Sequence, residues 1–344
     1  MMFCRILLKP LLKNEQKYSK AGLLALTDEP YFNPQLPFDR QAFSLELPIK
    51  QQGMSISGYQ PKLQLVIKDN QFNSVNQQGN YILKPSPTDY PFLAENEHAT
   101  MQVMKELGFD VPPNGLVAFQ VDKQAVKNSE EFAFIIKRFD RIDGVPIHQE
   151  QLDGAMNIQE KYGKIGSDNE QYVSYEQLVK FILFYLEDNL ALRQELFRRV
   201  VYAYLLGNND LHLRNFSLIY HKDGSRALAP VYDFVSVAPY PAIFNSSLLA
   251  LPLLQKEEGG KALAHGFHTK YGEYIGQDFI EFGENIGLNR NVIINKLLPQ
   301  LEKEREIVGQ IYQRSFMPQA DKETVLHCYH RRLKLIQVLD EPII

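Results

Sequence analysis

The sequence predicts an α+β fold with two lobes, in which a smaller β-rich lobe precedes a larger helical lobe. Short strand-like segments separated by turn residues occupy the chain up to about Phe139, and long amphipathic helical segments dominate from Asp140 onward. The length of 344 residues suits two compact lobes better than a string of small modules. We therefore expect a β-rich lobe over residues 51–139 and a helical lobe over residues 140–344.

The first 50 residues differ from both lobes. They contain five prolines and show little hydrophobic periodicity. Proline lacks a backbone donor and interrupts helices and central strands. We expect residues 1–50 to form an irregular arm that packs on the β-rich lobe.

The β-rich lobe should contain four strands and one helix. Pro85 and Pro87 end the second strand, and Gly108 ends the helix, whose inner face carries alanine, methionine and leucine. In chain order the expected elements are a strand at 62–68, a polar turn-rich tract at 69–80, a strand at 81–84, a helix at 93–107, and strands at 115–121 and 131–138.

The helical lobe should be built from long amphipathic helices. Two short strand-like segments, 216–220 and 229–231, interrupt them. The expected helices are 175–190, 193–206, 278–286, 291–312 and 322–339.

The composition excludes several classes of protein. A net charge of −4 argues against a chain that binds nucleic acid by itself, because phosphate binding needs a basic surface. Cys4 and Cys328 lie at opposite ends of the sequence, which excludes a zinc ribbon and disfavours a disulfide framework. The apolar stretch at 3–8 is interrupted by Arg5 and is too short for a signal sequence or a membrane span. We expect a cytoplasmic protein.

The strongest chemical signal is a polar loop between an apolar helix and a strand. Asp210 and Asn215 stand five residues apart in this loop, and Asp233 follows eighteen residues later, after the strand. Kinase catalytic loops have this spacing: the aspartate accepts the proton of the substrate hydroxyl, and the asparagine and a later aspartate bind magnesium. The alternative is a turn rich in Asn and Asp followed by an unrelated aspartate. The combination of helix, loop, strand and aspartate favours a site of phosphoryl transfer.

Two further features could bind phosphate. The segment 53–62 is rich in small residues, and its backbone N–H groups, with Lys62 beside them, could hold an anion; an ordinary hairpin turn is the alternative. Lys84 lies in an otherwise apolar strand, where an unpaired charge is costly to bury. Its ammonium group therefore either extends to solvent or meets phosphates and a carboxylate of the next helix, Glu95 or Glu97. We select Glu97 as the partner.

Five segments resemble the HipA-like toxin kinases and occur in that family's order from about Gly53 to the C-terminus. The motif D-x-H-x-x-N-F-S in the fourth segment is the most specific of them. The segments are SISGYQPK at 55–62, YILK at 81–84, KRFDR at 137–141, NDLHLRNFS at 209–217 and YD at 232–233.

The resemblance implies a two-lobed protein-kinase-like fold and an ATP- and Mg²⁺-dependent serine/threonine protein kinase. It makes Asp210 the catalytic residue, assigns Asn215 and Asp233 to magnesium, places Lys84 on the ATP phosphates and puts Phe139 at the adenine hinge. His212 matches a residue beside the catalytic aspartate, and packing of the loop is its alternative role. Ser55 matches a serine that the family autophosphorylates, and the second serine of the loop, Ser57, could be modified instead. The remaining residues that the resemblance assigns to the nucleotide site are Ser57, Gly58, Lys62, Lys137 and His212.

One departure from the family bears on partners. Longer HipA proteins have a further N-terminal subdomain, whereas only 52 residues precede Gly53. The chain therefore resembles the short HipT-type toxins, in which a separate small protein replaces that subdomain and is encoded with a helix-turn-helix antitoxin. The resemblance implies that DNA is contacted through the antitoxin. It also implies a substrate in translation, an aminoacyl-tRNA synthetase such as tryptophanyl-tRNA synthetase.

Two other functions remain open at this point. A small-molecule kinase of the aminoglycoside phosphotransferase type would use the same Asp210, Asn215 and Asp233, but the serine-bearing loop and the motif at 137–141 argue against it. A pseudokinase that serves as a co-repressor would not need an intact set of Lys84 and these three residues.

Overall fold

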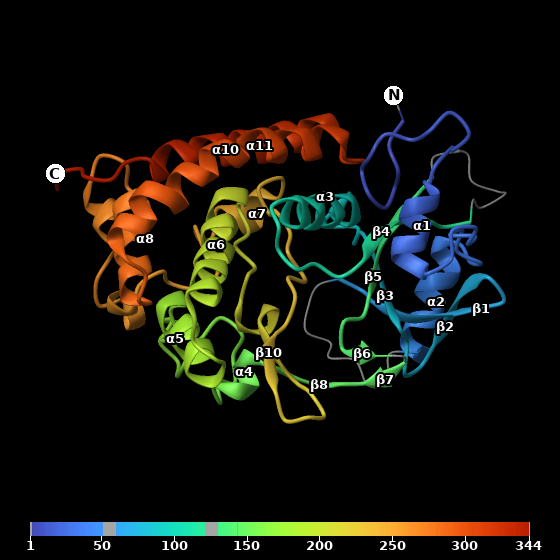
Figure 1. The fold of residues 1–344 in the computed structure, drawn as a ribbon, viewed down its shortest axis with the longest axis horizontal. Coiled ribbons are helices and arrows are strands. Elements are labelled where there is room, and N and C mark those ends of the chain that lie inside the picture. The colour runs from blue at the N-terminus through green and yellow to red at the C-terminus, as the bar shows by residue number, and fades with distance from the viewer. Residues whose placement is uncertain (1, 51–59, 121–129, 143, 344) are drawn as a thin grey trace. The chain divides into compact units, whose positions relative to one another are not determined.

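The computed structural model describes residues 2–50, 60–120, 130–142 and 144–343 (Figure 1). The chain divides into two compact units. Unit 1 comprises Met1–Pro146 and Gln310–Pro318, and unit 2 comprises Ile147–Gly309 and Gln319–Ile344.

Unit 1 is built on an antiparallel sheet of five strands in the order β2-β1-β3-β5-β4. The four strands expected from the sequence are present, but the tract 69–80 is not only a turn, because it contains a further strand. Phe72 is the fully buried side chain of that strand and packs edge-on against the rings of Phe32 and Tyr81. With one such residue among polar neighbours, the strand shows no alternating pattern. The strands are β1 (Leu63–Lys68), β2 (Gln71–Val75), β3 (Tyr81–Pro85), β4 (Asn114–Ala118) and β5 (Phe132–Lys137).

The N-terminal arm covers one face of this sheet and is not irregular throughout. It contains α1 (Lys20–Thr27), which the Ser19 hydroxyl caps at 3.0 Å from the Gly22 N–H, and α2 (Arg40–Lys50). Three of the five prolines that suggested an irregular arm lie between these helices, and Pro48 lies near the end of α2. The arm and the sheet share a core of buried apolar side chains that includes Leu23, Leu26, Phe32, Phe43, Leu63, Leu65 and Leu83.

Helix α3 (Leu93–Glu106) packs on the other face of the sheet. Adjacent side chains of a strand point to opposite faces. In β3, Leu83 joins the core shared with the arm, and the next residue, Lys84, reaches Glu97 of α3. A small hairpin, β6 (Arg141–Ile142) and β7 (Val145–Pro146), ends the first part of unit 1.

Unit 2 is mainly helical. Helix α6 packs against α5 and α11, and α11 also packs against α8. Among the helices of the described residues, none is both long enough and apolar enough to cross a membrane. The longer helices are α5 (Tyr175–Tyr185), α6 (Leu190–Leu206), α8 (Gly276–Asn285), α10 (Leu298–Arg314, whose last residues belong to unit 1) and α11 (Gln319–Ile336).

Short helical segments complete the unit. Residues 291–312, expected as one helix, are divided among α9, a π-helical turn and α10. The short segments are α4 (Leu152–Ala155), η1 (Leu213–Asn215), α7 (Pro241–Phe244), η2 (Gln255–Gly260), η3 (His265–His268), α9 (Arg290–Val292) and the π-helical turn η4 (Ile293–Leu297).

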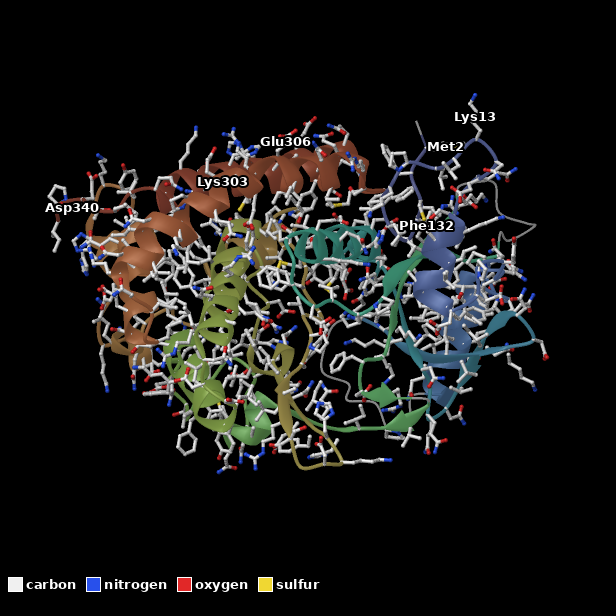
Figure 2. All side chains as sticks on the ribbon, viewed as in Figure 1. Met2, Lys13, Phe132, Lys303, Glu306 and Asp340 are labelled. Carbon is white, nitrogen blue, oxygen red and sulfur yellow. The ribbon has the colours of Figure 1, made fainter. Side chains whose placement is uncertain are left out.

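Helix α10 shows why the long helices of this unit could be predicted from the sequence. Leu301 and Val308 are buried, whereas Lys303 and Glu306 are exposed and point away from the helix in Figure 2. The two buried residues are seven positions apart, about two helical turns, which fits the amphipathic helical period.

A three-stranded antiparallel sheet in unit 2 has the order β10-β9-β8. Its strands are β8 (His148–Gln151), β9 (Ser217–Tyr220) and β10 (Arg226–Leu228). The sequence prediction of a strand at 229–231 was wrong by a few residues. Pro230 has no N–H to donate, so the ladder with β9 cannot continue through it.

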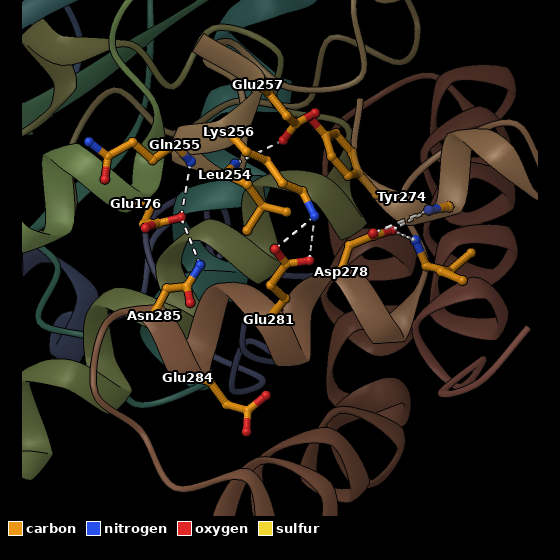
Figure 3. Close-up of polar contacts among 12 residues, drawn as sticks. Glu176, Leu254, Gln255, Lys256, Glu257, Tyr274, Asp278, Glu281, Glu284 and Asn285 are labelled. Atoms are coloured by element: carbon orange, nitrogen blue, oxygen red, sulfur yellow. Dashed lines mark hydrogen bonds and ion pairs between the residues drawn. The ribbon is translucent and has the colours of Figure 1, made fainter. Parts of the chain in front are cut away.

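A polar network joins α5, η2 and α8 (Figure 3). The carboxylate of Glu176 accepts hydrogen bonds from the Gln255 N–H and the Asn285 side chain, both at 3.0 Å, and from Lys180 at 2.6 Å. Burial alone would raise the pKa of Glu176, but these donors outweigh it and lower that pKa. Lys256 binds Glu281 of α8 at 2.7 Å. The network fixes the first turn of α5 against its neighbours within unit 2.

Candidate active site

Helix α6 delivers the predicted catalytic loop and ends abruptly. Its last turn is capped by Gly207 in the left-handed conformation, with φ of 69°. A Cβ atom at this position would lie 3.0 Å from the ring of Phe244 and 3.3 Å from the sulfur of Cys328. Glycine meets both demands, because it adopts positive φ without penalty and leaves room for these side chains. The chain therefore leaves the helix sharply and enters the loop at 208–215.

The loop is fixed by hydrogen bonds along its length. The Asn208 side-chain oxygen accepts from the Asp210 N–H at 3.1 Å, and the Asn209 amide donates to the Phe244 carbonyl at 2.9 Å. The hydroxyl of Tyr175 in α5 donates to the Leu211 carbonyl at 2.6 Å. Burial raises the pKa of Tyr175, which keeps this donor protonated. These contacts hold the loop in one conformation.

Asp210 is the carboxylate that the loop presents. Its side chain is 42% exposed, in contrast to the buried asparagines before it. Its Oδ1 atom accepts a hydrogen bond from the Tyr162 hydroxyl at 2.6 Å and lies 3.8 Å from both Lys161 Nζ and His212 Nε2. The carboxylate is thus accessible, as a proton acceptor for an incoming hydroxyl requires.

Asn215 and Asp233 are brought together, as the spacing predicted. The Asn215 amide donates to the backbone carbonyl of Asp233 at 3.1 Å. This bond directs the amide nitrogen away and leaves Asn215 Oδ1 buried without a hydrogen-bond partner among the described residues. Asp233 adopts a left-handed backbone with φ of 52°, uncommon for a residue other than glycine. A backbone of this kind at a binding site is maintained by its surroundings.

This oxygen arrangement fits a divalent cation. A buried acceptor is normally satisfied by protein, water or a ligand, so Asn215 Oδ1 is available to an ion. Magnesium prefers oxygen ligands and takes one or two from protein, with phosphates and water completing its shell. Across the described ranges, no group of three or more His, Cys, Asp or Glu side chains is placed to hold a metal by itself. Asn215 Oδ1 and Asp233 would supply one or two oxygen ligands of the kind that magnesium takes from protein.

The charged centre of unit 1 is the ion pair of Lys84 and Glu97. Lys84 Nζ lies 2.6 Å from Glu97 Oε1, and the two side chains are 5% and 3% exposed. The ammonium group also lies 5.6 Å from the centre of the Phe134 ring on β5. The predicted pairing with Glu97 is confirmed, and the alternative in which Lys84 extends to solvent is wrong.

Lys137 lies apart from Lys84 on the same sheet. It continues the row of Ala133 and Ile135 along β5, and those two side chains belong to the core shared with the arm. Its ammonium group binds the Asp28 carboxylate at 2.5 Å. Lys137 therefore faces the side of the sheet opposite to Lys84, and the structure does not bring the two together.

The other predicted residues occupy varied positions. Phe139 is half-buried in the bend after β5, and Lys62 is half-buried immediately before β1. His212 is buried, with its ring edge-on to that of Tyr162 at 5.3 Å. Burial lowers the pKa of His212, which favours the neutral ring. Ser55, Ser57 and Gly58 lie outside the described residues.

Lys161 and Tyr162 were missed by sequence reasoning. They precede Asp210 by about fifty residues and lie in a polar stretch without periodicity. Residue type and spacing gave no signal for either contact.

The chain is similar to known proteins over most of its length. The family described as HipA-like C-terminal domain matches residues 54–310. A Haemophilus influenzae protein named "Putative kinase" is 67% identical over 345 residues, which cover 99% of each chain. The serine/threonine-protein kinase toxin HipA of Shewanella oneidensis is 23% identical over 300 residues, which cover 82% of this chain and 62% of the toxin.

Two solved structures share the fold. HipA of Shewanella oneidensis, in a complex with HipB and operator DNA, matches with a TM-score of 0.61 and 21% identity, over 83% of this chain and 66% of that chain. The proinflammatory kinase CtkA of Helicobacter pylori matches with a TM-score of 0.52 and 16% identity, over 85% and 92% of the respective chains.

Proposed function

Because the chain belongs to the HipA-like C-terminal domain family, we propose that it is an ATP- and magnesium-dependent serine/threonine protein kinase that acts as a toxin. The observation that carries this proposal is the arrangement in unit 2. Asp210, which follows α6, has an accessible carboxylate. Asn215 donates a hydrogen bond to the Asp233 carbonyl, and its own buried Oδ1 accepts none from the described residues. Phosphoryl transfer needs such a proton acceptor and such metal ligands.

Each residue of unit 2 has a defined task in the proposed reaction. Asp210 accepts the proton of the substrate hydroxyl, and its contacts on Oδ1 leave Oδ2 for that purpose. Asn215 Oδ1 and the Asp233 carboxylate hold magnesium, which when bound neutralises charge on the phosphates. The neutral ring of His212 packs against Tyr162 and adds no charge to the site.

Unit 1 supplies the nucleotide phosphates with a cation. Lys84 is fixed in β3 by Glu97, and a lysine fixed in this way binds phosphate without first losing side-chain freedom. Phe139 is proposed for the adenine, and Ser57, Gly58 and Lys62 for the phosphate loop. We leave Lys137 out, because its ammonium group lies on the other face of the sheet.

The finer assignments follow the family. We assign the chain to the short HipT-type toxins of the cytoplasm, with autophosphorylation at Ser55 or Ser57. A HipB-like helix-turn-helix antitoxin and a small protein that replaces the N-terminal subdomain are the proposed partners. The proposed substrate is an aminoacyl-tRNA synthetase, with tryptophanyl-tRNA synthetase tested first.

The test is transfer of labelled phosphate from ATP in the presence of magnesium to a panel of purified aminoacyl-tRNA synthetases. The wild-type protein should label one synthetase and itself, and Asp210→Asn should label neither, with activity reduced about 10²- to 10⁴-fold. Transfer to aminoglycosides alone would establish a small-molecule kinase. No transfer to any acceptor by the wild-type protein would contradict the proposal.

A further inference from the structure

A loop that precedes α5 reaches the proposed catalytic carboxylate. The segment 160–172 folds back on itself, with a bridge between Lys164 and Gln171. From this segment the Tyr162 hydroxyl donates to Asp210 Oδ1 at 2.6 Å. That distance lies in the range of short, charge-assisted O–H···O⁻ bonds, which are stronger than neutral ones.

The backbone of Tyr162 is held at both of its polar groups. Its N–H donates to Glu160 Oε2 at 2.8 Å, and its carbonyl accepts from Gln171 Nε2 at 2.9 Å. The same Gln171 amide also donates to the Ala250 carbonyl at 2.8 Å. One residue earlier, the Lys161 carbonyl accepts from the Leu213 N–H of the catalytic loop at 3.1 Å. The segment is thus tied to the loop by its backbone as well as by the tyrosine side chain.

These contacts divide the two oxygens of Asp210 into different roles. Tyr162, Lys161 and His212 all approach Oδ1. Among the described residues, no hydrogen bond or ion pair is made to Oδ2. A carboxylate held at one oxygen cannot rotate freely, and the other oxygen then has a fixed direction.

We propose that Tyr162 is a positioning residue, which holds Asp210 by Oδ1 so that Oδ2 faces the hydroxyl of the substrate. This inference rests on the proposed function of Asp210 as the proton acceptor. The backbone bonds of Tyr162 and Lys161 fix the position from which the tyrosine side chain reaches Asp210. Lys161, with its ammonium group 3.8 Å from Oδ1, keeps a positive charge beside the carboxylate.

The test compares Tyr162→Phe with a matched control in the same segment. Tyr172 also donates its hydroxyl to a carboxylate at 2.6 Å, that of Asp168, and this pair is exposed and away from Asp210. Each substitution removes one hydroxyl and keeps the ring. Tyr162→Phe should lower kcat about tenfold, less than loss of the base itself, and leave KM for ATP and for the protein substrate unchanged. Tyr172→Phe should leave both parameters unchanged.

A second readout does not depend on activity. In protein labelled with ¹³C at aspartate carboxyl groups, the Asp210 signal is identified by its loss in Asp210→Asn. Tyr162→Phe should shift this signal, and Tyr172→Phe should not. An unshifted signal, an equal loss of kcat in both variants, or a faster Tyr162→Phe enzyme would overturn the inference. If the wild-type protein transfers no phosphate, the proposed function fails, and the carboxyl signal still decides whether Tyr162 holds Asp210.

Discussion

The two charged centres of the molecule are built in opposite ways. In unit 1, Lys84 and Glu97 are almost completely buried and bind each other. In unit 2, Asp210 is 42% exposed, and Asn215 keeps a buried oxygen that no described residue satisfies. The first centre is closed and the second is open.

This difference separates stability from function. A buried ion pair is a poor source of net stability, but removal of one partner leaves an uncompensated charge in a medium of low polarity. An open centre already tolerates unsatisfied groups in the absence of its ligands. Substitutions at the closed centre should therefore affect folding and activity together, whereas those at the open centre should affect activity more than stability.

The largest expected effect comes from breaking the closed pair. Lys84→Met leaves the Glu97 carboxylate buried without its cation and should reduce the free energy of unfolding by about 3–5 kcal/mol, with loss of kinase activity. Denaturant unfolding followed by circular dichroism measures the first quantity. The double variant Lys84→Met/Glu97→Leu places apolar groups at both positions and should recover most of the stability but none of the activity. Equal stability of Lys84→Met and wild type would show that the pair is not closed as described.

The open centre should respond in the opposite sense. Asn215→Leu removes the orphaned oxygen and one hydrogen bond to Asp233, which is worth about 1 kcal/mol. Calorimetry should show that affinity for ADP with magnesium falls about 10- to 100-fold, as for other disturbed metal sites. Affinity for ADP without magnesium is the internal control and should not change. An equal loss under both conditions would remove Asn215 from the metal site.

A smaller effect should arise where α6 ends. Gly207→Ala places a side chain in the left-handed region, at a cost of about 1–2 kcal/mol, and against the Phe244 ring. Gly224→Ala is the matched control, because φ is 85° there and no atom lies within 4 Å of the added Cβ. Both variants should lose stability in thermal unfolding, but only Gly207→Ala should also lose activity, since it displaces the catalytic loop. Equal activity of the two variants would show that the loop does not depend on this helix end.

The closed centre was predictable from sequence, whereas half of the open one was not. A lysine inside an apolar strand must find a partner, and this local rule led to Lys84 and Glu97. The kinase spacing likewise led to Asp210 and its companions. Tyr162 gave no signal, because its contact with Asp210 depends on the folding of a polar loop 48 residues away.

Prediction of the fold from sequence had a similar limit, because it depended on local patterns of apolar residues. Strands with several buried apolar residues were found, and β2, with Phe72 as its fully buried side chain, was not. The arm was expected to be irregular because of its five prolines, but three of them lie between α1 and α2, one precedes α1, and Pro48 lies near the end of α2. A count of prolines in a segment does not reveal where the uninterrupted stretches between them begin and end.

The smallest expected effect concerns the ion pair of Lys180 and Glu176, which lies outside both centres and shows how little a half-exposed pair contributes to stability. Lys180 binds Glu176 one helical turn away, and it is nearly half exposed, so solvent weakens the pair to about 0.3–0.5 kcal/mol. The donors around Glu176 lower its pKa in the folded protein. Its contribution to stability is therefore complete above the pKa of the unfolded chain, about 4.3, and is lost as the pH falls through the pKa of the folded protein.

Lys180→Met should therefore reduce the free energy of unfolding at pH 7 by about 0.3–0.5 kcal/mol, and the difference from wild type should shrink below about pH 4. Lys222→Met, at another exposed lysine, is the control for a change of net charge. Urea unfolding between pH 3 and pH 7 measures the difference, and a gap that persists unchanged at pH 3 would mean that Lys180 acts through packing of its methylene chain and not through the carboxylate.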